Sequence, residues 1–268
     1  MKLVETKVVN LREIHETAIV HPNAKIGRNV VIGPYAIIGE NVEIGDNCII
    51  GPHVLIEGWT TIGSGNRFHH GATIGGEPQD LKFRGERSFV FIGDNNVFRE
   101  NVTVNRGTEG GGSETRIGNN SLFMAYSHVS HDSQIGNHVV MGNCCSLGGH
   151  VVIEDRATVA GLSGVHQFCK IGKMSFVGGH TKIVKDVPPF VLVDGNPPKV
   201  FGTNVVGLRR NGIEPEVRDE IKRAYRILYR SNITIEQAIE RMEQELHGGP
   251  EIDYFIRFLR SAERGILR

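Results

Sequence analysis

Long apolar stretches are absent from this 268-residue sequence. No run of 18 apolar residues occurs, and the N-terminal segment MKLVETKVVNLREIHE has no apolar core, so we expect neither a transmembrane segment nor a secretory signal. An excess of charge of one sign is also missing, because 30 Lys and Arg residues balance 30 Asp and Glu residues. This balance argues against general binding to nucleic acid or to a membrane surface.

Cysteine is scarce as well, with four residues in the whole chain. Their spacing matches neither a disulfide framework nor a CxxC metal motif, and two of them are adjacent. The four are Cys48, Cys144, Cys145 and Cys169. Such a set suits reduced thiols, so the sequence predicts a cytoplasmic protein.

What the sequence contains instead is an apolar side chain at every sixth position from Ile14 to Ile183. One unbroken series covers 14–74, a second covers 117–183, and three further apolar positions lie between them in the same pattern. A fixed period indicates a repeated unit that buries its apolar face only against its neighbours. Six is neither the helical nor the simple strand period. It predicts a mainly β protein, a parallel β-helix with one strand, one turn and one inward-pointing residue per face.

Glycine often follows the repeated apolar residue. The positions are Gly27, Gly33, Gly39, Gly45, Gly51, Gly63, Gly118, Gly136 and Gly172. We expect these glycines at tight corners of the coil, where some residues need a positive φ.

Two interruptions break the repeat, over residues 75–91 and 105–116. The first contains the polar and charged sequence GGEPQDLKFRGERS, and the second contains NRGTEGGGSETR and shifts the phase of the repeat. We expect both segments to leave the coil as external loops. Loops held by a rigid scaffold are frequent sites of binding and chemistry, although tolerated surface insertions would look the same.

The period changes after Ile183, which predicts the division of the chain. We expect an N-terminal extension over 1–13, the β-helix over 14–190, and an exit segment with a helical domain over 191–268. Helical spacing covers 214–230 and 252–259, and Thr234 with Gln237 resembles a capping box. We expect this domain to cover the open end of the β-helix, because a solenoid needs a cap for its terminal strand edges.

Histidines gather in one part of the repeat, and their spacing points to chemistry. A coil of 18 residues places residue n beside residue n+18, about 4.8 Å away. His131 therefore neighbours Gly149, and Asp132 neighbours His150. An imidazole can remove a proton from a nucleophile while a glycine N–H approaches an oxyanion, so the pair suits acyl transfer. Asp132 could orient or tune the imidazoles.

Other readings of these motifs remain open at this point. Three histidines could bind zinc, but no further ligand completes the set, so we expect no metal and no cofactor. The stretch GTEGGG (107–112) lacks the Lys-Ser/Thr of a phosphate-binding loop, so we expect a flexible loop. Arg209 and Arg210 could meet phosphates, but an arginine pair alone is weak evidence.

Several long motifs together resemble one family, the UDP-N-acetylglucosamine O-acyltransferases of lipid A biosynthesis (LpxA). The matching stretches are IGGEPQDLKFRGE (74–86), VTVNRGTEGGG (102–112), HVSHDSQIGN (128–137), LGGHVVIED (147–155), GVHQFCKIG (164–172), DVPPFVLVDGNPPKVFGTN (186–204), GLRRNG (207–212) and AYRILYRS (224–231). The resemblance covers nearly the whole chain.

The resemblance implies a homotrimer of left-handed β-helices. Members transfer an (R)-3-hydroxyacyl chain from acyl carrier protein to the glucosamine 3-hydroxyl of UDP-N-acetylglucosamine. His131 would be the general base and the Gly149 N–H the oxyanion donor. The sugar-nucleotide site would be lined by Asp80, Lys82, His128, Asp132, His150, His166 and Gln167, with Asn204 and Arg210 at the uridine diphosphate. The acidic carrier protein would dock on basic residues at the cleft between prisms.

Further expectations follow from the resemblance. Gly179 matches a position where a small residue leaves the acyl groove long, and Phe176 nearby could shorten it. Val206 and Asn211 depart from the acidic residue and the second arginine that the family often carries.

The alternative functions are the related glucosamine N-acyltransferase, an acyltransferase acting on the 3-amino sugar analogue, a zinc lyase and a non-catalytic scaffold. The N-acyltransferase normally carries an extra N-terminal domain, whereas this repeat already begins at Ile14.

Overall fold

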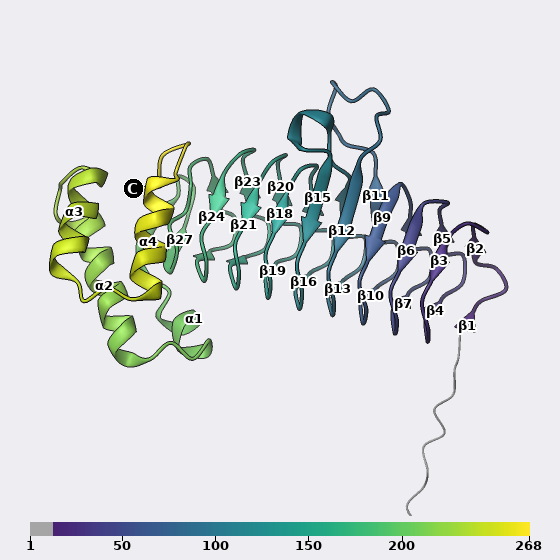
Figure 1. Cartoon of the computed structure of the whole chain (residues 1–268), viewed down its shortest axis with the longest axis horizontal. Coiled ribbons are helices and arrows are strands. Elements are labelled where there is room, and N and C mark those ends of the chain that lie inside the picture. Colours follow the sequence, from purple (N-terminus) through teal and green to yellow (C-terminus); the bar gives the residue numbers. More distant parts are fainter. Residues whose placement is uncertain (1–12) are drawn as a thin grey trace, which may run out of the picture.

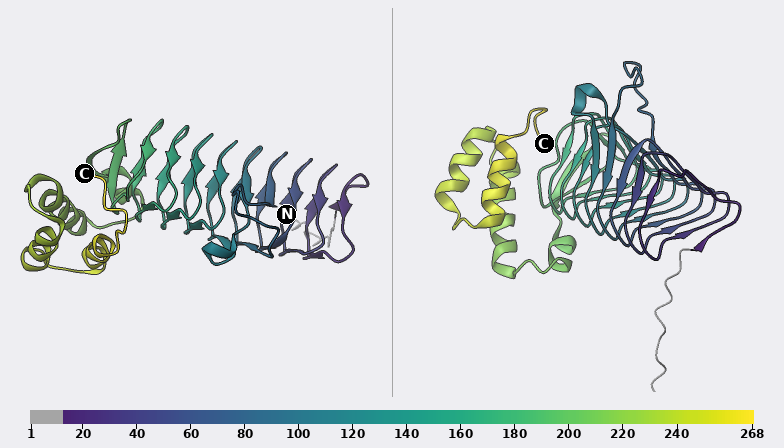
Figure 2. Two further views of the ribbon diagram at one scale, coloured as in Figure 1. Left: turned by 90° about the horizontal axis from the view of Figure 1, so that it is seen from above. Right: turned by 45° about the vertical axis from the view of Figure 1, so that its right-hand side comes forward.

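The computed structural model describes residues 13–268, so most of the expected N-terminal extension lies outside the described residues. Figure 1 shows stacked coils of short strands that form a long prism, with helices gathered at its C-terminal end. The right-hand view of Figure 2 shows the triangular outline of the coils. The predicted parallel β-helix is confirmed, because strands from successive coils pair in parallel to form three sheets.

Sheet A forms one wall of the prism. It contains β1 (Glu13–Ile14), β4 (Val31–Ile32), β7 (Ile49–Ile50), β10 (Arg67–Phe68), β13 (Val97–Phe98), β16 (Leu122–Phe123), β19 (Val140–Met141), β22 (Thr158–Val159), β25 (Phe176–Val177), β27 (Val191–Asp194) and β28 (Lys199–Thr203). The final pair, β27 and β28, is antiparallel and ends the sheet.

Sheet B forms the second wall. It contains β2 (Ile19–Val20), β5 (Ile37–Ile38), β8 (Leu55–Ile56), β11 (Thr73–Gly76), β14 (Thr103–Asn105), β17 (His128–Val129), β20 (Ser146–Leu147), β23 (Gly164–Val165) and β26 (Lys182–Ile183).

Sheet C forms the third wall. It contains β3 (Lys25–Ile26), β6 (Val42–Ile44), β9 (Trp59–Ile62), β12 (Phe89–Ile92), β15 (Glu114–Ile117), β18 (Gln134–Ile135), β21 (Val152–Ile153) and β24 (Lys170–Ile171).

The register explains why the sequence repeats every six residues. Gln134 pairs with Val152 and Val152 with Lys170, so neighbouring strands differ by 18 residues, as predicted. The repeated apolar residues point inward, and all of them from Ile32 to Ile183 are buried. Only the first few are not, because they lie at the open N-terminal end; Ile14 is 44% exposed. Each coil thus buries one apolar side chain per wall.

The nine glycines lie at the corners of the coil, as expected, but the positive φ of each corner falls on other residues. None of the nine glycines that follow the repeated apolar residues has a positive φ; that conformation falls two residues later, as at Asn29 (φ 53°) and Asn47 (φ 58°). The glycines are needed because consecutive coils touch. A Cβ on Gly27 would lie 2.6 Å from the carbonyl carbon of Gly45, and one on Gly45 would lie 2.7 Å from that of Gly63.

Polar side chains hold the coils in register along the edge between sheets C and A. Each accepts a hydrogen bond from the backbone N–H of the preceding coil, at 2.6 to 3.2 Å. The column consists of Asp46, Ser64, Asp94, Asn119, Asn137 and Asp155. These bonds satisfy backbone donors that the corners would otherwise leave unpaired.

Four helices follow the last strand: α1 (Val205–Arg210), α2 (Pro215–Arg230), α3 (Ile235–Glu245) and α4 (Pro250–Arg260). The capping box of Thr234 and Gln237 is confirmed at the start of α3. Tyr225 of α2 and Leu267 join the apolar core of the prism, so the helical domain packs on its C-terminal end (Figure 1). No helix among the residues described is long and apolar enough to cross a membrane.

Two external loops leave the same edge of the prism. Residues 77–88 connect β11 to β12, and residues 106–113, with a short 3₁₀ helix at Glu109–Gly111, connect β14 to β15. Both therefore run from sheet B to sheet C, and Figure 1 shows them side by side. We call this edge, where sheet B passes into sheet C, the B–C edge.

Candidate active site

The next coils place the predicted histidines on this same B–C edge. His131 and Asp132 lie between β17 and β18, and Gly149 and His150 lie between β20 and β21. The His150 N–H donates to the carbonyl of His131 at 3.0 Å, which confirms that the two corners are stacked. Both external loops and the histidine cluster therefore share one edge of the prism.

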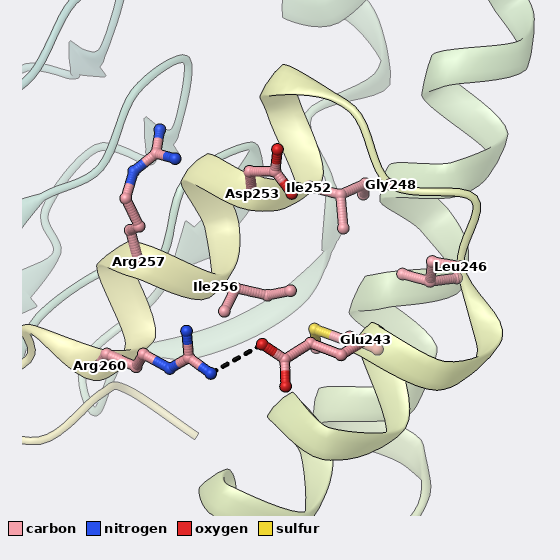
Figure 3. Close-up of a pocket in the computed structure, with 9 residues that line it drawn as sticks. Glu243, Leu246, Gly248, Ile252, Asp253, Ile256, Arg257 and Arg260 are labelled. Carbon is pink, nitrogen blue, oxygen red and sulfur yellow. Dashed lines mark hydrogen bonds and ion pairs between the residues drawn. The ribbon is translucent and has the colours of Figure 1, made fainter.

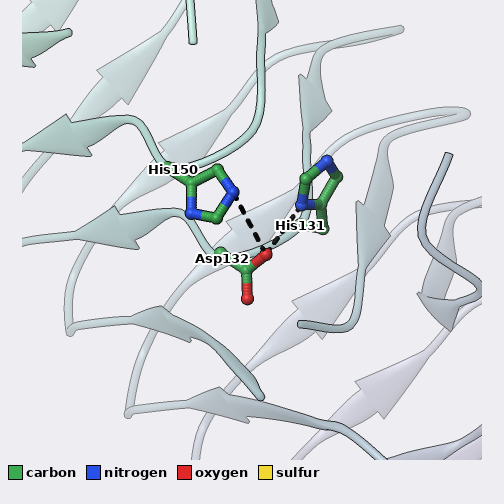
Figure 4. A group of neighbouring side chains, drawn as sticks. All are labelled: His131, Asp132 and His150. Carbon is green, nitrogen blue, oxygen red and sulfur yellow. Dashed lines mark hydrogen bonds and ion pairs between the residues drawn. The ribbon is translucent and has the colours of Figure 1, made fainter. Parts of the chain in front are cut away.

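His131 and Asp132 form a hydrogen-bonded pair (Figure 4). Nδ1 of the ring lies 2.7 Å from Oδ2 of the carboxylate. The side chains are nearly buried, with 10% of His131 and none of Asp132 exposed. Because an ionised carboxylate only accepts, Nδ1 carries the proton and Nε2 of the neutral ring keeps a free lone pair. Among residues 13–268, Nε2 has no hydrogen-bond partner, so it can accept a proton from a ligand.

Thr108, from the second loop, completes the surroundings of Asp132. Its N–H donates to Oδ1 at 2.8 Å and its hydroxyl donates to Oδ2 at 2.6 Å. Burial opposes ionisation of Asp132, but the hydrogen bonds from His131 and Thr108 outweigh it and lower the pKa of the carboxyl. Asp132 is therefore an anion at neutral pH.

The His131 ring packs directly against Gly149. A Cβ at this position would lie 2.4 Å from Cε1 and 2.6 Å from Nε2 of the ring. The Gly149 N–H donates to no acceptor among the described residues, whereas its carbonyl accepts from Phe168 at 3.1 Å. The site thus holds an unpaired N–H next to a free imidazole nitrogen.

Two further imidazoles flank the pair. Nε2 of His150 lies 3.7 Å from Oδ2 of Asp132, and the ring stacks on Phe168 with centroids 4.4 Å apart. Burial lowers the pKa of His150, against the opposing effect of Asp132. Nδ1 of His128 lies 2.7 Å from the Thr103 hydroxyl, and burial also lowers the pKa of His128. Both rings are therefore neutral at neutral pH and can accept or donate hydrogen bonds.

The first loop brings Asp80 and Lys82 to the same edge. Asp80 is near enough to His150 to act on its charge, and its carboxylate accepts from the Lys82 N–H at 2.9 Å. Buried Arg106 anchors the loop: it donates to the Gly75 carbonyl at 3.2 Å, and its guanidinium lies 5.2 Å from the Phe83 ring centroid.

Other predicted residues do not meet the pair within one chain. His166 and Gln167 are exposed on the next coil. Asn204 caps α1 by accepting from the Gly207 N–H at 3.0 Å, and it donates to the Met174 carbonyl at 2.9 Å. Arg210 is exposed in the last turn of α1. Phe176 lies on sheet A and Gly179 on the edge between sheets A and B, away from the B–C edge.

Part of the loop expected to be flexible, 107–112, is packed against Asp132, whereas Glu109, Gly110 and Gly112 are exposed. Besides the bonds from Thr108, the loop packs so closely that a Cβ on Gly111 would lie 2.0 Å from Cγ of Asp132. The sequence analysis missed Thr108 and Gly111 because the insertion breaks the n+18 rule at this coil: Thr103 pairs with His128, 25 residues on. A signal was present, since both loops interrupt the repeat at the same corner that carries His131, two coils and one coil earlier.

Ligand atoms of His131, Asp132 and His150 lie within 4.8 Å of one another, which is the spacing of a possible metal site. The oxygens of Asp132, however, already accept from both donors of Thr108 and from His131. A metal would have to displace at least one of these donors. The donor set therefore fits an imidazole–carboxylate pair better than a zinc centre.

A concave surface of the described residues lies away from this edge. One cavity of about 350 Å³ lies between α3 and α4, with Met242, Leu246 and Ile252 in its lining and an ion pair between Arg260 and Glu243 (Figure 3). None of its lining residues belongs to the B–C edge. Because the edge is an outer corner of the prism, we expect a substrate pocket there to need another surface opposite it.

Comparison with known proteins agrees with this picture. The family model "Bacterial transferase hexapeptide (six repeats)" matches 13–45, 23–58, 41–76 and 114–149, and the model "UDP N-acetylglucosamine O-acyltransferase; Domain 2" matches 186–267. The chain is 47% identical over 255 residues to an acyl-[acyl-carrier-protein]–UDP-N-acetylglucosamine O-acyltransferase of Anaeromyxobacter sp. (strain K), covering 95% of this chain and 99% of that one. A relative with the same name from Myxococcus xanthus is 43% identical, over 96% of this chain and all of its own.

Solved structures show the same likeness. The UDP-N-acetylglucosamine acyltransferase of Bacteroides fragilis superposes with a TM-score of 0.92 at 42% identity, covering 95% of this chain and 100% of that chain. The enzyme of Acinetobacter baumannii gives 0.92 at 40% identity, covering 95% and 99%. The fold is thus the left-handed β-helix expected above. The chain belongs to the acyl-[acyl-carrier-protein]–UDP-N-acetylglucosamine O-acyltransferase family.

Proposed function

We propose that the protein transfers an (R)-3-hydroxyacyl chain from acyl carrier protein to the glucosamine 3-hydroxyl of UDP-N-acetylglucosamine. The observation that carries the proposal is the His131–Asp132 pair: among the described residues, Nε2 of His131 and the neighbouring Gly149 N–H have no hydrogen-bond partner. A base and an oxyanion donor next to each other are the two groups that acyl transfer from a thioester needs.

In the proposed reaction the sugar 3-oxygen attacks the thioester carbon while Nε2 of His131 takes the hydroxyl proton. The carbonyl oxygen becomes an oxyanion, which accepts from the Gly149 N–H. Collapse of this intermediate forms the ester and breaks the C–S bond. The imidazolium then returns the proton to the departing thiolate, so the base is restored and no cofactor is consumed.

Asp132 supports the base in two ways. Its hydrogen bond at 2.7 Å keeps the proton of the neutral ring on Nδ1, so that Nε2 faces the substrate as an acceptor. Its negative charge then stabilises the imidazolium that forms during attack. Because the pKa of Asp132 is lowered, this charge is present throughout the neutral range.

The remaining predicted residues would position the acceptor. His128 and His150 are neutral and close to the base, and Asp80 and Lys82 reach the same edge from the first loop. His166 and Gln167 follow on the next coil. We assign these residues to the sugar, and Asn204 and Arg210 at the end of the prism to the uridine diphosphate. Arg156 donates to Asn211 at 2.7 Å, and Arg210, like Arg209, is exposed beside it.

A homotrimer would supply the missing surface of the pocket. The outer face of sheet A carries a mostly apolar row, interrupted by Arg67 and Thr158, and such a row is unusual for a solvated wall. The row contains Val31, Ile49, Val97, Leu122, Val140, Phe176 and Leu192. If this wall meets the B–C edge of a second copy, Gly179 and Phe176 come opposite the base and would line the acyl groove. A Cβ on Gly179 would have only the Gly161 carbonyl oxygen, at 3.3 Å, within 4 Å.

A cytoplasmic site of action belongs to the same proposal. All four cysteines are free, and Cys144 and Cys145 are adjacent without forming a disulfide, as suits a reducing compartment.

The test is product analysis by mass spectrometry. The purified protein is incubated with UDP-N-acetylglucosamine or its 3-amino analogue and with carrier proteins that bear 3-hydroxyacyl chains of several lengths. An alkali-labile ester on the sugar 3-oxygen supports the proposal. An amide formed only with the amino analogue, or no transfer from any acyl carrier protein, contradicts it.

A further inference from the structure

The second loop makes an unusual contact with the reactive pair. Oδ2 of Asp132 accepts two hydrogen bonds, one from Nδ1 of His131 at 2.7 Å and one from the Thr108 hydroxyl at 2.6 Å. The same oxygen that binds the base is thus shared with a neutral donor from another segment. The Thr108 N–H meanwhile holds Oδ1 at 2.8 Å.

The loop also seals this carboxylate from water. Thr108 is 6% exposed, the Asp132 side chain is fully buried, and Gly111 packs against the carboxylate with no space for a Cβ. In such surroundings each hydrogen bond to the anion is strong, because water does not compete for the oxygen. A change of one donor therefore alters the charge density at Oδ2 directly.

We propose that Thr108 is a positioning residue that sets how strongly Asp132 holds the imidazole of His131. The proposal rests on the proposed function, because Thr108 affects the rate of acyl transfer only if His131 is the general base. The hydroxyl fixes the carboxylate plane and withdraws part of the negative charge from Oδ2. The remaining charge on Oδ2 stabilises the imidazolium enough for His131 to take the proton during attack. It does not stabilise the imidazolium so strongly that the ring fails to return the proton to the leaving thiolate.

The direction of the effect follows from the groups around Asp132. Facing it are His131 and His150; of the other titratable groups, His128 interacts with His131 and Asp80 interacts with His150. Loss of the Thr108 hydroxyl leaves all of these in place and returns full charge to Oδ2. The imidazolium of His131 then becomes more stable relative to the neutral ring, so the base protonates at a higher pH.

The experiment compares Thr108→Val with Thr108→Ser, because valine keeps the shape and removes the donor whereas serine keeps the donor. The acid limb of kcat/KM against pH is expected to move upward by about 0.5 to 1 pH unit in the valine variant, from the loss of one hydrogen bond to a charged group. We expect kcat to fall about tenfold with little change in KM, and serine to restore both the limb and most of the rate. Thr61→Val, an exposed threonine of sheet C, serves as the control that changes neither.

A second readout does not depend on turnover. Deuterium exchange at the C2–H of histidine, followed by mass spectrometry, reports the titration of His131 in the intact protein. An upward shift in Thr108→Val and not in Thr108→Ser supports the proposal. Equal rate losses in both variants with an unmoved titration would overturn it and make the loop merely structural. If the wild type transfers no acyl chain, the proposed function fails while this titration still decides the role of Thr108.

Discussion

At the residue scale, the proposed chemistry depends on how closely the His131 ring packs against Gly149. The n+18 rule predicts from the sequence that His131 lies beside Gly149, and the stacked corners confirm it. What the rule could not predict is which atoms meet. The direction of the ring is set by its bond to Asp132 and by the absence of a Cβ on Gly149. The need for glycine here is therefore steric and independent of φ, which is not positive at this residue.

Gly149→Ala tests this packing. The backbone accepts alanine, but the new Cβ would lie 2.4 Å from Cε1 of His131, so the ring has to move. A displacement of about 1 Å at a reacting group costs on the order of 10²-fold in rate, so we expect kcat to fall by one to two orders of magnitude. Steady-state kinetics measure the loss, and circular dichroism should show an unchanged fold. Gly202→Ala is the matched control, because its Cβ would meet nothing within 4 Å; equal kinetics for the two variants would contradict the argument.

At the element scale, the coil is the unit that the sequence encodes best. The six-residue period predicts the strands, their parallel pairing and the inward side chains, because each coil repeats the same contacts. The loops were predicted only as excursions, since an insertion has no neighbour at n+18. Hence the contact of Thr108 with Asp132 and the anchoring of the first loop by Arg106 were not foreseen. Helix α1 (Val205–Arg210) was also missed, because it is too short to show a helical period.

Phe98→Ala tests how much the core of one coil contributes to the free energy of unfolding. Its ring stacks between Phe68 and Phe123, with centroids 4.7 Å away on each side, and it is fully buried. Removing a buried phenylalanine side chain costs about 3 to 5 kcal/mol, whereas Phe98→Leu leaves a smaller cavity and costs less. Urea unfolding followed by circular dichroism measures both. If the alanine variant unfolds at the wild-type urea concentration, the stacked rings of Phe68, Phe98 and Phe123 do not stabilise the coils.

At the scale of the whole molecule, the half-buried acid Glu154 links the helical domain to the prism. Glu154, which follows β21, accepts hydrogen bonds from the Tyr254 hydroxyl of α4 and from the Lys173 N–H. Burial raises the pKa of Glu154 above its ordinary value of 4.5. The folded protein therefore holds this proton more tightly than the unfolded chain, and the contribution to stability decreases as the pH rises through the raised pKa.

Glu154→Gln removes this titration and keeps an oxygen that can accept from both donors. We expect the variant to be more stable than the wild type at pH 7.5, because it avoids a partly buried charge, and we expect the difference to shrink as the pH falls toward 4.5. Thermal unfolding across this pH range gives the comparison. A variant that is less stable at every pH would show that the carboxylate binds Tyr254 and Lys173 as an anion.

The most direct test of the central claim is the rate of acyl transfer by His131→Ala, measured beside His138→Ala. His138 is an exposed histidine in the next corner of the same coil and lies outside the site. General-base catalysis contributes about 10²- to 10⁴-fold, so the account predicts a loss of that size for His131→Ala and wild-type turnover for His138→Ala, both variants being folded. Turnover by His131→Ala within a few-fold of the wild type would contradict the account.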